Sequence, residues 1–189
     1  MMNKLVLGAA LLAFGTLSSP AAFAQDMTVT SAEVSEGSTI KDAQVANVFG
    51  CKGGNISPSL NWSGAPSDTK SFAITVYDPD APTGSGFWHW VVFNIPASTT
   101  SVPLNAGDVK KKMMPKGAIQ SRTDFGTDGY GGPCPPQGDK PHHYIFTVYA
   151  VDEDKLQFAK DHNVSAAVVG FELHFHAKAK GVLTAIYGR

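Results

Sequence analysis

Short hydrophobic runs, separated by glycine, proline and polar residues, follow one another along most of this chain. Runs of about four to eight residues rich in valine, isoleucine and aromatic side chains are typical of buried strands. The pattern predicts three such strands, at Ser71–Tyr77, Trp90–Ile95 and Tyr144–Val151. Weaker alternation predicts further strands at Asp26–Glu36, Ala46–Phe49, Leu60–Trp62 and Val182–Tyr187.

Helical spacing of hydrophobic residues occurs in one segment near the C-terminus. Ser165 is a favourable N-cap residue, so we expect a helix that runs from there to about Lys178 and ends at Gly181. Beyond this helix we expect at most one helical turn, near Val109–Met114, and the fold class is therefore mainly β, a β-rich α+β domain. Residues three or four apart give the helix one apolar stripe, made of Val164, Val168, Phe171 and Phe175.

Composition supports a folded domain and argues against nucleic acid as a partner. Hydrophobic residues make up 43% of the chain and charged residues 16%, a balance that disordered proteins do not have. The formal net charge is −1, which offers no electrostatic attraction to nucleic acid or to an anionic membrane surface. The basic cluster Lys110–Lys112 is interpreted as a solvated loop.

The first 24 residues have the pattern of a cleavable signal peptide. Lys4 supplies a positive start, Leu5–Leu17 is an apolar stretch too short for a membrane span, and Ala22–Ala24 forms an A-x-A cleavage signature. We therefore expect residues 25–189 to form a single domain that is exported to a bacterial periplasm, without stable membrane insertion. Loss of Lys4 changes the formal net charge from −1 to −2.

Two cysteines, Cys51 and Cys134, are present. An oxidising compartment favours a disulfide between them, which in the chain-entropy model contributes about 4–5 kcal/mol. The alternative is two separate buried thiols.

Polar residues gather where the predicted buried strands begin or end. Asp78 and Asp80 follow one strand, His89 precedes the next, and Pro141–Tyr144 (PHHY) opens the third. Proline is excluded from a central ladder, so the two aspartates should lie on a stiff turn, where a carboxylate must be solvated, bonded or available to a ligand. Asp80 is interpreted as the residue that caps this turn through its own backbone.

The motifs at these positions resemble those of the phosphatidylethanolamine-binding protein (PEBP) family, in particular its bacterial Raf kinase inhibitor-like YbhB/YbcL branch. His143 stands where many relatives have arginine, and Phe175 stands where many have glycine. The matching motifs occur in order across nearly the whole predicted mature domain: GGNISPSLNWSG (53–64), YDPDAPTGSGFWHWVVFNIP (77–96), DFGTDGYGGPCPP (124–136), PHHYIFTVYA (141–150) and YGR (187–189).

This resemblance implies a PEBP-like antiparallel β-sandwich with a Greek key, small flanking helices and a small anion-binding pocket at one end. It implies that Asp78, His89, His142 and Tyr144 line the pocket, and that the backbone N–H of Cys134 faces the ligand. Its walls would be formed by Pro79, Ala81, Pro82, Pro133, Cys134, Pro135 and Pro136.

Such a set of groups suits a phosphate head group, because a phosphate needs hydrogen-bond donors from several directions. His89, His142 and Tyr144 can each donate a hydrogen bond. Asp78 should repel an anion, so we expect it either to orient and charge a neighbouring histidine or to accept from an ammonium group such as ethanolamine.

We therefore predict a non-enzymatic binding protein for a small phosphorylated or anionic ligand, with no cofactor and no metal. His174 and His176 lie two residues apart on the predicted helix, so they do not share a face and are a poor metal pair. The resemblance also allows a regulatory or protein-inhibitor role, a protein partner and a homodimer.

Two alternatives stay open. The first is a hydrolase that uses Asp78 with His89 or His142, or that uses Cys134 as nucleophile if this residue carries a free thiol. The second is a protease-inhibitor-type interaction module, for which residues 110–122 are a candidate contact loop.

Overall fold

The computed structural model describes residues 27–156 and 164–189, which form eight strands and one α-helix. The predicted signal peptide lies outside the described residues. All strand pairs are antiparallel. The three-stranded sheet has the order β1 (Thr28–Thr30), β2 (Leu60–Ser63), β5 (Ser101–Val102). The five-stranded sheet has the order β6 (Ile119–Gln120), β4 (Phe87–Pro96), β3 (Ser71–Asp78), β7 (His142–Val151), β8 (Ala177–Tyr187).

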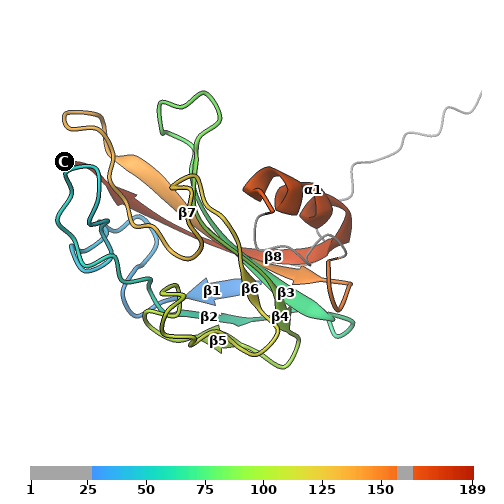
Figure 1. Cartoon of the computed structure of the whole chain (residues 1–189). Coiled ribbons are helices and arrows are strands. Elements are labelled where there is room, and N and C mark those ends of the chain that lie inside the picture. Colours follow the sequence, from blue (N-terminus) through green and yellow to red (C-terminus); the bar gives the residue numbers. More distant parts are fainter. Residues whose placement is uncertain (1–26, 157–163) are drawn as a thin grey trace, which may run out of the picture.

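The two sheets and the helix α1 (Ala166–His176) form three layers, with the five-stranded sheet in the middle (Figure 1). One buried cluster fills the space between the sheets and includes Ile74, Val76 and Trp90. A second cluster lies between the other face of the large sheet and α1, and includes Val91 and Leu173. The predicted mainly β fold with antiparallel sheets is confirmed.

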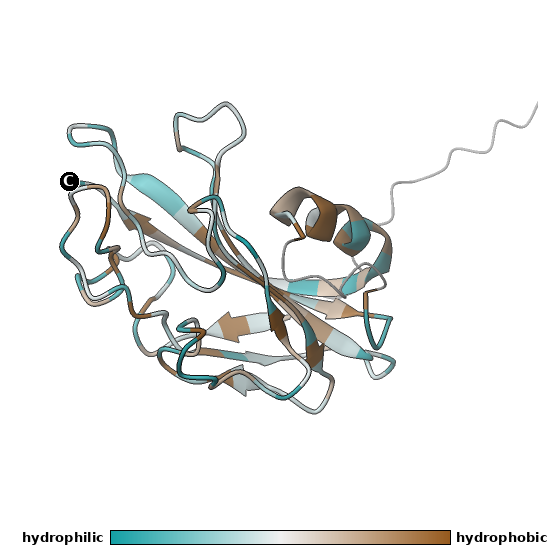
Figure 2. Ribbon diagram, viewed as in Figure 1, coloured by the Kyte–Doolittle hydropathy of each residue, from teal (hydrophilic) through white to brown (hydrophobic). Residues whose placement is uncertain are grey.

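Burial on both faces explains why the central strands are almost continuously hydrophobic. Along β3, Ile74 and Val76 point into the space between the sheets, whereas Ala73 packs toward α1. A strand covered by a sheet on one side and a helix on the other gains from apolar side chains at successive positions. Figure 2 shows hydrophobic residues along both sheets and over much of α1.

The three long strands were predicted, but each extends closer to the polar motifs than expected. β3 continues to Asp78, β4 begins at Phe87 rather than Trp90, and β7 begins at His142 rather than Tyr144. The register pairs Asp78 with Phe87 across β3 and β4. The polar residues therefore lie inside the ends of neighbouring strands, at one end of the sheet, and the sheet itself fixes their spacing.

The helix was predicted with its N-cap but not with its buried face or its end. The Ser165 side chain accepts from the Val168 amide, as expected. The helix stops at His176, however, and Gly181 lies within β8, where a side chain would approach the carbonyl oxygen of Met27, just before β1, at 2.6 Å. The buried residues are Ala166, Val169 and Leu173, whereas Val168, Phe171 and Phe175 of the predicted stripe are exposed.

The predicted strand at Ala46–Phe49 is wrong. This segment forms turns, in which Phe49 has a φ of 52° and the Ala46 amide donates to the Pro133 carbonyl. The first strand is also shorter than predicted, because only Thr28–Thr30 of residues 26–36 pairs with β2. The strands β5 and β6 were not predicted, because each has two residues, which are too few to show an alternation of hydrophobic and polar positions.

Cys51 and Cys134 form a disulfide, with their Cα atoms 6.0 Å apart, so the predicted pairing is confirmed and the alternative of two thiols is wrong. In the described part of the chain, no helix has the length and hydrophobicity needed to cross a membrane.

Candidate functional site

A cavity of about 210 Å³ opens where β3 ends and where β4 and β7 begin. Nine of the eleven predicted ligand-binding residues line it, and Pro79 and Pro133 do not. The lining residues are Phe49, Asp78, Ala81, Pro82, Thr83, Phe87, His89, Phe125, Cys134, Pro135, Pro136, His142 and Tyr144.

Asp78 is buried at 2% exposure and uses both carboxylate oxygens. Its Oδ1 accepts from the backbone amides of Asp80 (2.8 Å) and Ala81 (3.1 Å), which closes the turn after β3. Its Oδ2 lies 2.8 Å from Nδ1 of His142. Asp78 therefore holds the turn and the histidine in one geometry, which is the contact expected if it orients a neighbouring imidazole.

The turn-capping role predicted for Asp80 belongs to Asp78 instead. Asp80 reaches outward, and its Oδ2 accepts from the backbone amide (2.8 Å) and from Nδ1 (2.7 Å) of His143. The backbone hydrogen bond from His143, followed by the side-chain bond, lowers the pKa of Asp80. Asp80 and His143 do not line the cavity, so they act on the turn from its exposed side.

His142 is buried and held by carboxylates at both ring nitrogens. Nδ1 donates to Asp78, and Nε2 lies 3.6 Å from Oδ2 of Asp139, which is 44% exposed. The Asp78 contact fixes the proton on Nδ1, because a carboxylate can only accept a hydrogen bond. Nε2 is then the nitrogen that can meet a ligand: it accepts when the ring is neutral and donates when the ring is protonated.

His89 is equally buried, at 4% exposure, and its Nδ1 is 2.7 Å from the carbonyl oxygen of Gly131. The carbonyl can only accept, so Nδ1 carries a proton. Burial lowers the pKa of His89, despite opposing contributions from this carbonyl and from Asp78. The unliganded side chain is therefore neutral at neutral pH, and the predicted role of His89 as a donor to an anion requires that the ligand brings a proton or that the ring takes one up.

Tyr144 contributes a donor that lies near Asp78 but makes no well-formed hydrogen bond to it. Its side chain is 1% exposed, and its hydroxyl has no hydrogen-bond partner of good geometry among the described residues. Burial, and then the nearby charge of Asp78, raises the pKa of Tyr144 well above its ordinary value, so the hydroxyl keeps its proton. The ring packs edge-to-face on His89 with centroids 5.1 Å apart.

No lysine or arginine lines the cavity within the described ranges. Its polar side-chain groups are one carboxylate, two imidazoles, one phenol and the Thr83 hydroxyl, set among proline and phenylalanine side chains. An oxyanion in such a site needs either protonated imidazoles or a positive charge of its own.

Comparison with known proteins places this chain in a family. The model of the family described as "Phosphatidylethanolamine-binding protein" matches residues 30–188. This chain belongs to the phosphatidylethanolamine-binding protein family.

The chain is 50% identical to the UPF0098 protein YbcL of Escherichia coli K12 over 184 residues, which covers 97% of this chain and 98% of YbcL. It is 47% identical to the UPF0098 protein YbhB of the same organism, over 85% of this chain and 99% of YbhB. The crystal structure of E. coli YbcL superposes with a TM-score of 0.84 at 51% identity, and covers 87% of this chain and 99% of that chain. The predicted membership of the family is confirmed.

Four lining residues of this family member were not predicted: Phe49, Thr83, Phe87 and Phe125. Phe87 could have been found, because residues two apart on a strand share a face and His89 is on β4. Phe49 could have been found from the disulfide, which brings the segment before Cys51 to the proline-rich wall. Phe125 and Thr83 lie in loops, whose positions the sequence pattern does not determine.

Asp152, Glu153 and His176 have ligand atoms within 4.8 Å of one another in the described part of this PEBP-family chain. They lie beyond the end of β7 opposite to His142, and so outside the cavity. Asp152 already pairs with Lys178 at 2.6 Å and with His176 at 3.0 Å. These ion pairs explain why the three side chains lie close together.

Proposed function

We propose that this protein is a non-enzymatic binding protein whose cavity takes the phosphate of a small ligand, as its sequence predicts. The observation that carries the proposal is the buried Tyr144 hydroxyl, which makes no hydrogen bond of good geometry among the described residues, although the Asp78 carboxylate lies near it and two imidazoles line the same cavity. A buried hydroxyl without a partner costs free energy, so its presence is best explained by a ligand that supplies the acceptor.

The size and the polarity of the cavity favour a head group. A cavity of about 210 Å³ is smaller than the clefts of about 300–1,000 Å³ that hold drug-sized ligands. Since the site holds a carboxylate and no lysine or arginine side chain among the described residues, a ligand with both a phosphate and an ammonium group fits its charge better than a phosphate dianion. Phosphoethanolamine is the simplest such ligand.

Export to the periplasm is part of this proposal. The pattern of residues 1–24 supports it, and so does the disulfide, because disulfides persist in oxidising compartments.

The test is binding of inorganic phosphate and of phosphoethanolamine, measured by calorimetry and by thermal protection. Wild-type protein should be protected by both compounds, with phosphoethanolamine the stronger, and His89→Ala should abolish the protection. His174→Ala is the matched control, because His174 is exposed on α1 and does not line the cavity. Equal protection of wild type and His89→Ala would refute the assignment of the pocket.

A hydrolase remains the second candidate because His142 and Asp78 form a buried pair of the kind used in acid–base catalysis. The variant of this idea with Cys134 as nucleophile is ruled out while the cysteine is in a disulfide. Release of phosphate from phosphoethanolamine, absent in His142→Ala, would favour the hydrolase over the binding protein.

A further inference from the structure

Phe49 has an unusual environment for a phenylalanine. It is 68% exposed, it lines the mouth of the cavity, and its φ of 52° lies in the left-handed region. A bulky side chain in that region is strained, and such strain persists only when surrounding structure holds it in place. Neither its burial nor its backbone conformation explains a phenylalanine at this position.

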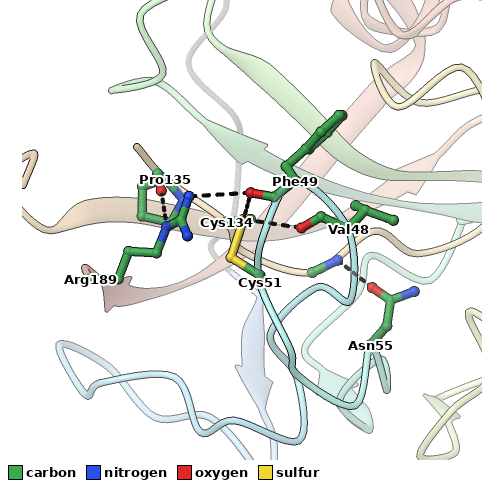
Figure 3. The surroundings of a disulfide bond; sticks show 8 residues. Val48, Phe49, Cys51, Asn55, Cys134, Pro135 and Arg189 are labelled. Atoms are coloured by element: carbon green, nitrogen blue, oxygen red, sulfur yellow. Dashed lines mark hydrogen bonds between the residues drawn. A yellow bond between two sulfur atoms is a disulfide. The ribbon is translucent and has the colours of Figure 1, made fainter. Parts of the chain in front are cut away.

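Two restraints hold the Phe49 turn against the proline-rich wall of the cavity (Figure 3). The disulfide joins Cys51, two residues further along, to Cys134, which itself lines the cavity. The Arg189 side chain donates from Nε to the Pro135 carbonyl at 2.6 Å and from Nη2 to the Phe49 carbonyl at 3.4 Å. One link is covalent and the other comes from the last residue of the chain, and both connect the turn to the same wall.

Phe49 is part of a continuous group of rings that leads from the surface to the deep imidazole. Its ring stacks on Phe125 at 5.8 Å with an interplanar angle of 15°, and Phe125 packs against Phe87 at 4.9 Å. Phe125 also contacts the His89 ring at 5.4 Å. We call Phe49, Phe87 and Phe125 the aromatic collar. A ligand whose phosphate reaches His89 can therefore place its next atoms against phenylalanine.

We propose that Phe49 is a specificity-determining residue, held by the disulfide and Arg189, and that the aromatic collar binds an apolar carbon group esterified to the phosphate of the ligand. This inference rests on the proposed phosphate site. It assigns the ligand to the phosphate esters with an apolar substituent and excludes sugar-like phosphates as preferred ligands, since hydroxyl groups buried against three phenyl rings would lose their hydrogen bonds to water.

The experiment compares three probes by calorimetry: inorganic phosphate, n-butyl phosphate and sn-glycerol 3-phosphate. The two esters have similar lengths and differ in the hydroxyl groups of the carbon chain. Wild-type protein should bind n-butyl phosphate roughly tenfold more tightly than sn-glycerol 3-phosphate, the effect of burying about two additional methylene groups.

The variants separate the aromatic collar from the phosphate site. Phe49→Ala should reduce the preference for n-butyl phosphate to near unity while the dissociation constant for inorganic phosphate stays within about twofold of wild type. Phe49→Leu should retain most of the preference, because leucine keeps an apolar side chain. Phe171→Ala is the matched control: Phe171 is 62% exposed but lies on α1, outside the cavity, and its loss should change nothing.

Reduction of the disulfide should have the same effect on ligand choice as Phe49→Ala. The double variant Cys51→Ser/Cys134→Ser, assayed below its unfolding midpoint, should bind inorganic phosphate but discriminate less between the two esters.

The outcomes distinguish this inference from the proposed function. If wild type binds inorganic phosphate but shows no preference between the esters, or if Phe49→Ala keeps the full preference, the aromatic collar is not a specificity element and the inference is overturned. If wild type binds none of the three probes, the phosphate site itself is wrong.

Discussion

Substitution of Tyr144 by phenylalanine should stabilise the unliganded protein and weaken its ligand binding at the same time. The side chain is 1% exposed, and its hydroxyl has no partner of good geometry in the described structure. A buried hydroxyl without a hydrogen bond costs about 1–3 kcal/mol. Tyr144→Phe removes that cost and keeps the ring contact with His89. Taking the lower figure, about 1 kcal/mol corresponds to a rise in Tm of about 2–4 °C.

The same hydroxyl is the donor that needs no change of protonation to meet a phosphate. A hydrogen bond to a charged group contributes about 1.5–3 kcal/mol, so Tyr144→Phe should weaken phosphate binding by about 10- to 150-fold. Differential scanning calorimetry with and without phosphoethanolamine measures both quantities. The unliganded Tm should rise, and the shift on adding ligand should shrink.

Tyr130→Phe is the matched control. Tyr130 is also a buried tyrosine, but its hydroxyl donates to the Gln44 carbonyl at 3.1 Å and it does not line the cavity. Its loss leaves that carbonyl without a partner, so the variant should be destabilised by about 1 kcal/mol with unchanged ligand binding. Destabilised Tyr144→Phe with normal binding would refute the reasoning, because the hydroxyl would then serve the fold, with Asp78 as the acceptor.

Three further predictions concern the framework of the site. Burial lowers the pKa of His89 in the folded state. As the pH falls below about 6.5, the unfolded chain therefore takes up a proton on this histidine more readily than the folded chain does. Stability should therefore fall as the pH drops from about 6.5 to 5, and His89→Asn should flatten this slope in urea titrations. The variant Cys51→Ser/Cys134→Ser should lose up to about 4 kcal/mol of unfolding free energy, because the disulfide closes a loop between residues 83 positions apart. The same urea titrations measure this loss, and a loss below about 1 kcal/mol would contradict a stabilising effect of loop closure. Gly132→Ala should unfold the protein or lower its Tm by several degrees, because the added Cβ would lie 2.1 Å from the Gln44 carbonyl oxygen. An unchanged Tm would show that the backbone around Gly132 can move to make room for a methyl group.

The deep part of the site could be predicted because it lies on strands. His89, His142 and Tyr144 lie where apolar runs begin. The period of these runs fixes which side chains share a face, and antiparallel pairing brings the beginnings of two runs to the end of a third. The remaining lining residues that were predicted came from the motifs, which resemble those of a known family. The hydrophobic pattern underestimated the length of each strand. Polar residues at a strand end interrupt this pattern, but their backbones still pair with the neighbouring strand.

The mouth of the site could not be predicted in the same way. Phe49 and Phe125 lie in turns. The disulfide brings the Phe49 turn to the proline-rich wall, but the sequence pattern does not determine where the Phe125 loop meets it. The turn role assigned to Asp80 was wrong for a related reason: both aspartates can cap the turn, and only the position of His143 shows that Asp80 faces outward.

Helix α1 shows how an apolar stripe can indicate the wrong face. The spacing of Phe171 and Phe175 is that of a buried stripe, yet both rings are exposed and pack on each other at 5.0 Å. The helix instead buries Val169 and Leu173, whose smaller side chains fit against the sheet. Because this helix is hydrophobic on both sides, spacing alone does not decide which side faces the core.

The most direct test of the central claim is a crystal structure of the protein soaked in phosphate. We predict a tetrahedral density within hydrogen-bond distance of the Tyr144 hydroxyl and of Nε2 of both His89 and His142. A cavity that holds only water at saturating phosphate, or a phosphate bound elsewhere with the Tyr144 hydroxyl turned to Asp78, would contradict it.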